Sequence, residues 1–170
     1  MTRLRPLAFL ALAPAFAAPA LAQNAALAGT FTLNRQKSDN VNQAVDQAVN
    51  RVNAILRPIA RGRLRSTNQP YQRVVVAQQG TQLSIITDRR AAILTPAAGT
   101  PVRWRREDGE TLNVSTRWNG QSLVQTFAAE DGQRVNTYTM NPDGTMTIAV
   151  TVTSGRLPRP LTYRLVYDKQ

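Results

Sequence analysis

The sequence contains no cysteine and no histidine among its 170 residues. Without cysteine there can be no disulfide, so the folded chain must be stabilised by packing alone. Without histidine the commonest general base and metal ligand is missing, and the two absences together exclude thiol nucleophiles, Ser-His-Asp triads and zinc sites of the usual ligands. A glycine-rich phosphate loop is absent as well. We therefore expect no metal, no cofactor and no enzymatic activity.

Acidic residues are also scarce, with ten against 21 basic residues. An enzyme built from this chain would have to rely on carboxylates, as glycosidases do. Three of the aspartates precede a glycine, where Asp-Gly has a conformational explanation as a turn, and glutamates flank these turns at Glu107, Glu110 and Glu130. Catalysis is therefore the third hypothesis, behind two binding functions.

The first 22 residues have the layout of a cleavable secretory signal peptide. Arg3 and Arg5 precede an apolar run over 7–16, and Ala20-Leu21-Ala22 forms a small-residue cleavage site. The apolar run is shorter than a membrane-spanning helix requires and prolines interrupt it. We predict cleavage after Ala22, export to the periplasm, and one domain over 23–170 without a transmembrane segment.

The mature chain is strongly basic, with 19 basic and 10 acidic residues and a net charge of +9. This balance favours anionic partners. The densest basic stretch suggests a patch for lipid headgroups or lipopolysaccharide, made of Arg57, Arg61, Arg63, Arg65 and Arg73. The alternative is a solvated face, since charge runs are usually solvated and a cation near a helix C-terminus also complements the macrodipole. Nucleic acid is not expected, because export and the lack of interleaved aromatic residues argue against it.

One amphipathic helix is predicted over about 40–57. Apolar residues recur there at steps of three and four, at Val41, Val45, Val49, Val52, Leu56 and Ile59. Ser38, Asp39 and Asn40 supply a cap, and Pro58 and Gly62 are expected to end the helix.

The rest of the chain predicts strands. Gly29–Leu33 is a short strand before the helix, and from Tyr71 onward apolar residues alternate with polar ones. Turn dipeptides recur 11 or 12 residues apart, at Asp108-Gly109, Asn119-Gly120, Asp131-Gly132, Asp143-Gly144 and Ser154-Gly155. A long antiparallel meander exposes two edges unless it closes, so we expect an up-and-down β-barrel of about 8–10 strands. The alternative is an open sheet covered by the helix.

Several segments resemble the calycin barrels, which include lipocalins and fatty-acid-binding proteins. They are the first strand Gly29–Leu33, the string 123–127 and the closing strand 163–169. The order strand, helix, meander is similar to that of fatty-acid-binding proteins in particular. The resemblance, which extends to lipocalin-like exported bacterial proteins, implies a barrel whose interior binds a small apolar or amphipathic molecule.

The closing strand departs from the family pattern. The family's carboxylate-binding pair is Arg-x-Tyr, whereas this chain has Arg164-x-x-Tyr167. In a regular strand these two side chains face opposite ways, so the pair does not carry over unless a bulge intervenes. An alternative role for Arg164 is to stack on Phe31 and close one end of the barrel.

The leading hypothesis places a ligand against the aromatic residues of the meander, at Trp104, Trp118, Phe127 and Tyr163. A charged end of the ligand would meet Arg103, Arg117 and Arg164, although alternation predicts these three on the opposite face. Aromatic residues at alternate positions on an apolar face are more often core than binding site, and the sequence leaves both a hollow and a packed interior open.

Overall fold

The computed structural model describes residues 26–88 and 90–170, and the predicted signal peptide lies outside this part of the chain. Ten strands make up most of it: β1 (Gly29–Asn34), β2 (Arg73–Gln79), β3 (Gln82–Thr87), β4 (Ile93–Pro96), β5 (Val102–Arg105), β6 (Thr111–Asn119), β7 (Ser122–Ala128), β8 (Gly132–Met140), β9 (Met146–Ser154) and β10 (Leu161–Lys169). Two helices, α2 (Val41–Val49) and α3 (Arg57–Thr67), lie between β1 and β2. Neither is long and apolar enough to cross a membrane.

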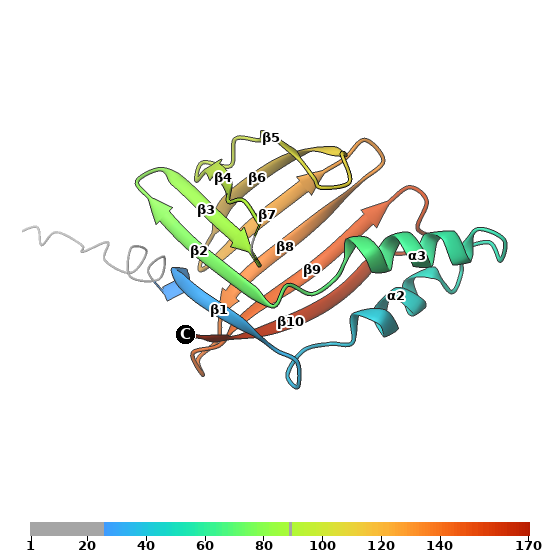
Figure 1. The fold of residues 1–170 in the computed structure, drawn as a ribbon, viewed down its shortest axis with the longest axis horizontal. Coiled ribbons are helices and arrows are strands. Elements are labelled where there is room, and N and C mark those ends of the chain that lie inside the picture. The colour runs from blue at the N-terminus through green and yellow to red at the C-terminus, as the bar shows by residue number, and fades with distance from the viewer. Residues whose placement is uncertain (1–25, 89) are drawn as a thin grey trace, which may run out of the picture.

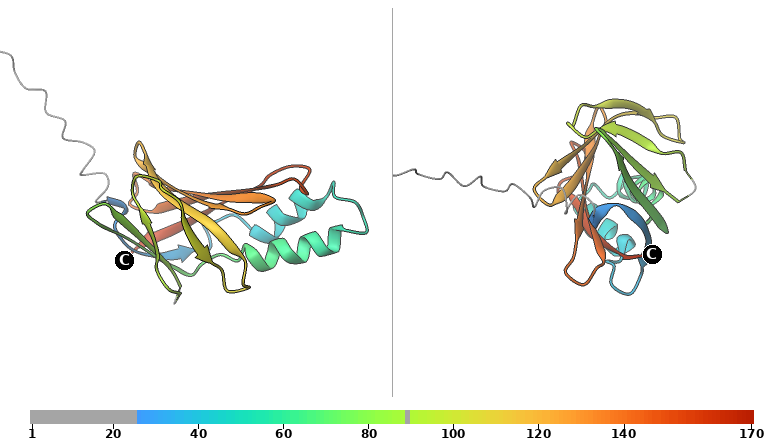
Figure 2. Two further views of the ribbon diagram at one scale, coloured as in Figure 1. Left: turned by 90° about the horizontal axis from the view of Figure 1, so that it is seen from above. Right: turned by 90° about the vertical axis from the view of Figure 1, so that its left-hand side faces the viewer.

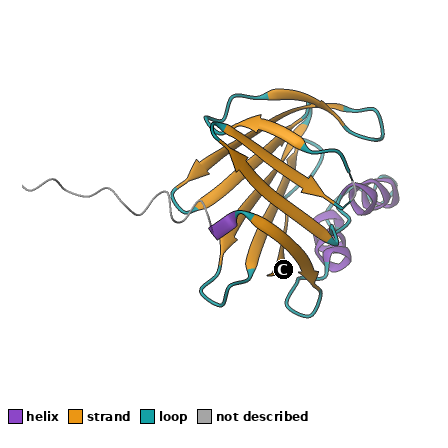
Figure 3. Ribbon diagram, turned by 60° about the vertical axis from the view of Figure 1, so that its left-hand side comes forward, coloured by secondary structure: helices purple, strands orange, loops and turns teal. Residues whose placement is uncertain are grey.

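The strands form one antiparallel sheet that curls into a nearly closed barrel (Figures 1 and 3). β1 pairs with both β2 and β10, so the first strand joins the two halves of the meander. The barrel stays open between β4 and β5, which share no ladder, and a single bridge from Ala98 to Arg117 spans that side. The predicted up-and-down barrel is confirmed.

The hairpins occur at the predicted dipeptides, but Gly132 and Gly155 do not adopt the positive φ expected of turn glycines. Gly120 has a φ of 59°, as a tight turn after Asn119 requires. Gly132 lies inside β8, where a Cβ would sit 2.3 Å from the backbone oxygen of Thr153. Glycine is needed there for close strand approach and not for turn geometry.

The single helix predicted over 40–57 is wrong in extent. α2 ends at Val49, and the chain turns before α3 begins at Arg57. The Asn53 side chain accepts a hydrogen bond from the Ile55 backbone N–H at 2.9 Å, which stabilises this turn locally. Pro58 lies in the first turn of α3, where its missing N–H costs nothing, so it starts a helix where a stop was expected.

The two helices form a hairpin that projects from one end of the barrel (Figure 2). α2 packs on β10 and buries Val41, Val45, Ala48 and Val49. α3 packs on α2 and has no buried residue. The hairpin is therefore attached mainly through α2, and α3 adds the partly buried Leu64, which packs against the core.

The core consists of the inward side chains of the strands, in two clusters. The larger one gathers around β1, β2, β3, β8, β9, β10 and α2, with Phe31, Leu83, Met146 and Tyr167 fully buried. The smaller one lies beneath the open side, where Ile93, Leu112 and Val114 pack with the partly buried Trp104 and Phe127. Side chains thus fill most of the barrel interior.

Candidate ligand site

A row of polar side chains crosses the apolar interior on β7 and β8. The period of two places Arg134, Asn136 and Tyr138 on the inner face of β8. The register sets Asn136 opposite Gln125 and Tyr138 opposite Leu123 on β7. Asn136, Tyr138 and Gln125 are each at most 2 % exposed.

These side chains form a directional chain of hydrogen bonds. Arg134 Nε donates to Asn136 Oδ1 at 2.8 Å, and Asn136 Nδ2 donates to Tyr138 Oη at 3.4 Å. Tyr138 Oη donates in turn to Gln125 Oε1 at 2.8 Å. Burial raises the pKa of the Tyr138 phenol, which keeps its proton for this bond.

This row of hydrogen bonds ends at a donor that has no acceptor. Gln125 Nε2 is buried and has no hydrogen-bond partner among residues 26–88 and 90–170. Such a group carries the cost of desolvation, about 1–3 kcal/mol. An acceptor atom placed beside it would recover that free energy.

An enclosed hollow of about 20 Å³ lies beside this donor. Gln125, Asn136 and Tyr138 line it together with residues from both sides of the open side of the barrel, among them Ile93 of β4 and Trp104 of β5. A space of this size accommodates one water-sized group. The hollow therefore suits the acceptor atom of a ligand head, while a longer tail requires the surrounding side chains to move.

Positive charge surrounds the hollow without an equal number of carboxylates. The guanidinium of Arg134 lies 5.8 Å from the ring centroid of Tyr71, and that of Arg90 lies 5.5 Å from it. Arg90 pairs with Glu107 at 2.9 Å. Arg134 is half-buried, donates to Thr67 O at 3.4 Å, and has no acidic partner within the described chain. A carboxylate ligand would supply the missing counter-charge.

Two of the four aromatic residues predicted as ligand contacts meet at the hollow. Trp104 and Phe127 both line it and pack edge to face, with ring centroids 5.8 Å apart. Tyr163 is buried in the larger cluster, where its hydroxyl donates to Asn68 Oδ1 at 3.2 Å. Trp118 packs at the edge of that cluster and donates through Nε1 to Gln78 Oε1.

The structure places the predicted charged end away from the barrel interior. Arg103, Arg117 and Arg164 are all exposed on the outer face of the barrel. β10 pairs with β9 without a bulge from Leu161 to Tyr167. The Arg164 side chain therefore keeps the outward direction that strand alternation gives it. The alternation that placed these three outside therefore holds.

The proposed stacking of Arg164 on Phe31 is wrong for the same reason. Phe31 points into the barrel and is fully buried, and the cation over its ring is Lys169 Nζ, 5.7 Å from the centroid. The guanidinium of Arg164 lies 3.9 Å from Asp39, while its backbone N–H donates to the same carboxylate at 2.7 Å.

The predicted arginine patch does not form one free surface. Arg61 and Arg65 both bind Asp46 of α2 at 2.9 Å. Arg63 approaches Glu110 at 3.7 Å, and Arg57 donates to its own turn at Val52 O. Arg73 lies on β2 and not on the helix. Four of the five arginines therefore make contacts within the fold.

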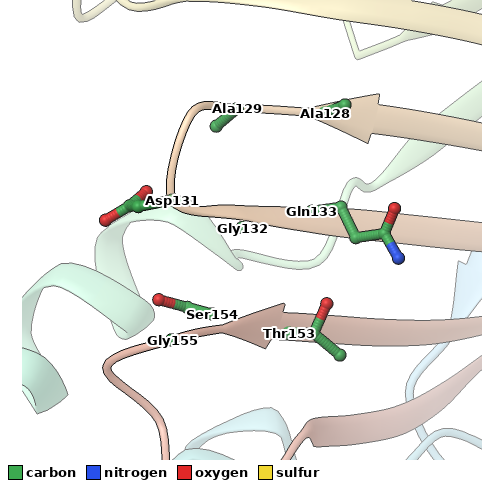
Figure 4. A pocket seen from close by; sticks show the side chains of 8 residues that line it. All are labelled: Ala128, Ala129, Asp131, Gly132, Gln133, Thr153, Ser154 and Gly155. Carbon is green, nitrogen blue, oxygen red and sulfur yellow. The ribbon is translucent and has the colours of Figure 1, made fainter.

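A second hollow, about 390 Å³ and open to solvent, lies on the surface between the β7–β8 turn and the end of β9 (Figure 4). Short side chains line it, and its one charged residue, Asp131, pairs with Arg156 at 3.4 Å. Backbone groups here bond one another, as Ala129 N–H does to Gly132 O. This hollow offers little specific chemistry, so the interior site is the better candidate.

The sequence matches no family model and no curated protein. Solved structures do match. A protein described as the REP1-NXSQ fatty acid transporter aligns over 86 % of this chain and 97 % of its own, with 18 % identity and a TM-score of 0.57. A fatty acid binding protein of Schistosoma mansoni in complex with arachidonic acid covers 87 % and 98 % at 18 % identity and a TM-score of 0.56. Human cRBP IV covers 85 % and 98 % at 18 % identity and a TM-score of 0.53.

The chain has a calycin-like fold. Its two helices between the first and second strands and its nearly closed ten-stranded sheet match that architecture. At a sequence identity below one fifth, the similarity to these structures shows the fold alone. The function of this calycin-like barrel must therefore be inferred from its own residues.

Proposed function

We propose that this calycin-like barrel binds a small amphipathic molecule with its hydrogen-bond-accepting head beside Gln125 and its apolar part against Trp104 and Phe127. The observation that carries the proposal is the buried, unpartnered Gln125 amide at the end of a hydrogen-bonded chain that begins at a cation. Buried polar groups without a partner are rare. The described chain has two others, Thr95 Oγ1 and Thr116 Oγ1, but of the three residues only Gln125 lines the hollow.

A carboxylate head fits this site best. Every hydrogen bond in the row that starts at Arg134 points the same way, so the positive end of the row is the Gln125 amide. Arg134 itself lacks a carboxylate partner in the described residues. A neutral head such as an alcohol would satisfy Gln125 but leave the charge of Arg134 unbalanced. We therefore expect the acid to bind more tightly than the alcohol of equal chain length.

The open side between β4 and β5 supports entry there. No ladder joins these strands, so their separation breaks side-chain contacts without breaking a row of backbone hydrogen bonds. Trp104 and Ile93 face each other across that side as part of the smaller core cluster. Their displacement would extend the hollow of about 20 Å³ to hold an apolar tail.

The experiment is a titration of the mature chain with a matched acid, alcohol and alkane, monitored by tryptophan fluorescence because Trp104 lines the site. We expect Gln125→Leu to weaken acid binding by about three- to tenfold, the loss of one hydrogen bond. Gln82→Leu is the matched control, since Gln82 is exposed on β3. Equal affinity for acid and alkane, or equal effects of the two variants, would contradict the proposal.

We further propose that the protein works as a non-enzymatic binder in the periplasm. The support is the signal-peptide layout of residues 1–22 and the absence of histidine and cysteine. Native mass spectrometry of the periplasmic fraction would give a polypeptide starting at Gln23 and any co-purified ligand. A full-length cytosolic product would refute the location while leaving the titration intact.

A further inference from the structure

Strand β5 is the last strand of the sheet, and part of its backbone has no partner strand (Figure 1). The Arg106 backbone N–H donates to Glu110 O at 2.8 Å, so the backbone of Arg106 is directed at β6. Backbone groups alternate in direction along a strand. Those of Trp104 are therefore directed at β6 as well, whereas those of Arg103 and Arg105 are directed away from it. Each of these two arginines presents a backbone N–H and C=O to the open side of the barrel.

The other edge of the open side, on β4, is less suited to pairing. Ala97 N–H donates to Thr81 O at 2.8 Å, so the same alternation directs the backbones of Leu94 and Pro96 at the open side. Proline has no N–H, and a proline on an edge strand discourages pairing. β5 contains no proline from Val102 to Arg105. The edge that is competent to pair is therefore that of β5.

The side chains at this edge carry uncompensated positive charge. Arg103 and Arg105 are exposed on the outer face, and neither forms an ion pair within the described residues. The three acids of the turn that follows are already paired with other arginines, at 2.5 to 2.9 Å. Trp104, between the two arginines, points inward and is only partly buried. A strand added here thus meets two cations on the outer face and an aromatic ring on the inner face.

We propose that the edge of β5 binds an extended acidic segment of another protein by adding it to the sheet as a further antiparallel strand. Acidic residues two apart in that segment lie opposite Arg103 and Arg105, because side chains two apart share one face of a strand. The apolar residue between them lies against Trp104. Main-chain hydrogen bonds supply the affinity of such a contact, and alternate side chains supply its specificity.

A second copy of the chain fits this edge poorly. Antiparallel pairing of two β5 edges about Trp104 places Arg103 of one copy opposite Arg105 of the other, and like charges in direct opposition destabilise a sheet. The net charge of +9 on the mature chain adds repulsion between copies and attracts an acidic partner. A polyanion without amide groups meets the arginines but leaves the backbone groups unpaired. Charge and backbone together therefore favour an acidic peptide.

The experiment measures binding of a short peptide of alternating glutamate and valine to the mature chain by isothermal titration calorimetry. We expect the matched peptide of alternating lysine and valine not to bind. Arg103→Gln and Arg105→Gln should each weaken binding of the acidic peptide about two- to fivefold, the contribution of an exposed ion pair. Arg73→Gln is the matched control and should leave binding unchanged, because Arg73 is an exposed arginine of β2, which has a neighbouring strand on both sides. Circular dichroism checks that the variants are folded.

N-methylated peptides separate strand addition from attraction between charges. In an antiparallel pair the glutamates opposite Arg103 and Arg105 direct their N–H groups at β5, and the valines direct theirs away. We expect methyl groups on the glutamate nitrogens to abolish binding and methyl groups on the valine nitrogens to be tolerated. Hydrogen exchange gives a second measurement. The amides of Arg103 and Arg105 should exchange about tenfold more slowly with the peptide bound, whereas that of Trp104, which is directed at β6, should be protected throughout.

Three outcomes would overturn the proposal. These are equal binding of the acidic and basic peptides, equal effects of the two methylation patterns, and self-association of the free chain that protects the amides of Arg103 and Arg105. The last would assign this edge to a second copy of the chain. Peptide binding is measured without the acid and should be unchanged by Gln125→Leu, so this proposal and the interior site can fail separately.

Discussion

The hydrogen bond between Tyr138 and Gln125 allows a quantitative test of the interior site. Tyr138→Phe removes the only donor to Gln125 Oε1 that the structure shows, beside an Nε2 that already lacks a partner. Leaving a buried carbonyl unsatisfied costs about 1–3 kcal/mol. We expect a loss of about 2 kcal/mol in the free energy of unfolding.

Gln125→Leu is the second single variant of a double-mutant cycle on this pair, and it should behave differently. Gln125→Leu leaves the Tyr138 hydroxyl without its acceptor, which lowers the free energy of unfolding by about 1–3 kcal/mol. The same change removes the unpartnered amide, which raises the free energy of unfolding by a similar amount. This single variant should lie within about 1 kcal/mol of the unaltered chain. The double variant replaces both partners by apolar groups, and the Asn136 amide loses its acceptor in this variant as it does in Tyr138→Phe. The double variant should therefore be more stable than Tyr138→Phe, with a coupling energy of about 2 kcal/mol.

The assay is urea unfolding of the mature chain, followed by tryptophan fluorescence and circular dichroism, with constant m-values as the test of two-state behaviour. Gln82→Leu serves again as the exposed control and should change stability by less than about 0.5 kcal/mol. The reasoning is refuted if Tyr138→Phe is equally mild, or if the double variant is less stable than Tyr138→Phe alone.

Two further predictions concern the fold itself. Burial raises the pKa of Tyr138, Tyr163 and Tyr167, so these phenols stay protonated when folded and ionise near pH 10 when unfolded. Stability is therefore full below pH 10 and falls above it; phenolate absorbance should rise cooperatively with unfolding, and smooth ionisation of all four tyrosines in the folded state would contradict this. Gly132→Ala places a Cβ against Thr153 O and should cost more than about 2 kcal/mol in urea unfolding, whereas Gly155→Ala, with open space around it, should cost little; equal losses would show that the close approach of β8 and β9 does not matter.

The sequence predicts the barrel well because its signals are local. The turn dipeptides and the period of two in each strand depend on neighbouring residues only, and the observed hairpins follow them. The break between α2 and α3 was harder to foresee, because the periodicity of apolar residues continues through Val52, Leu56 and Ile59 although the backbone does not. The choice of Pro58 as a first-turn residue depends on how α3 folds back on α2.

The interior polar site was missed for a related reason. The predicted ligand contacts did not include Arg134 and Asn136, although these two side chains of β8 alternate in phase with the buried Tyr138. That alternation was the available signal: Arg134, Asn136 and Tyr138 are two residues apart. Arg103 and Arg117 were predicted as ligand contacts although each is the direct neighbour of Trp104 or Trp118. Neighbouring side chains in a strand face opposite ways, so these two arginines must face outward.

Helix α3 connects the turn of the helical hairpin to the interior site. Ile59 lies in its first turn, and ten residues after Arg57, roughly 15 Å along the axis, its last residue Thr67 accepts the hydrogen bond from Arg134. Asn68 and Tyr71, just beyond, hold Tyr163 and Tyr167 through their hydroxyls.

A carboxylate that draws Arg134 toward Gln125 must weaken the contact of Arg134 with Thr67, and so must loosen the C-terminal end of α3.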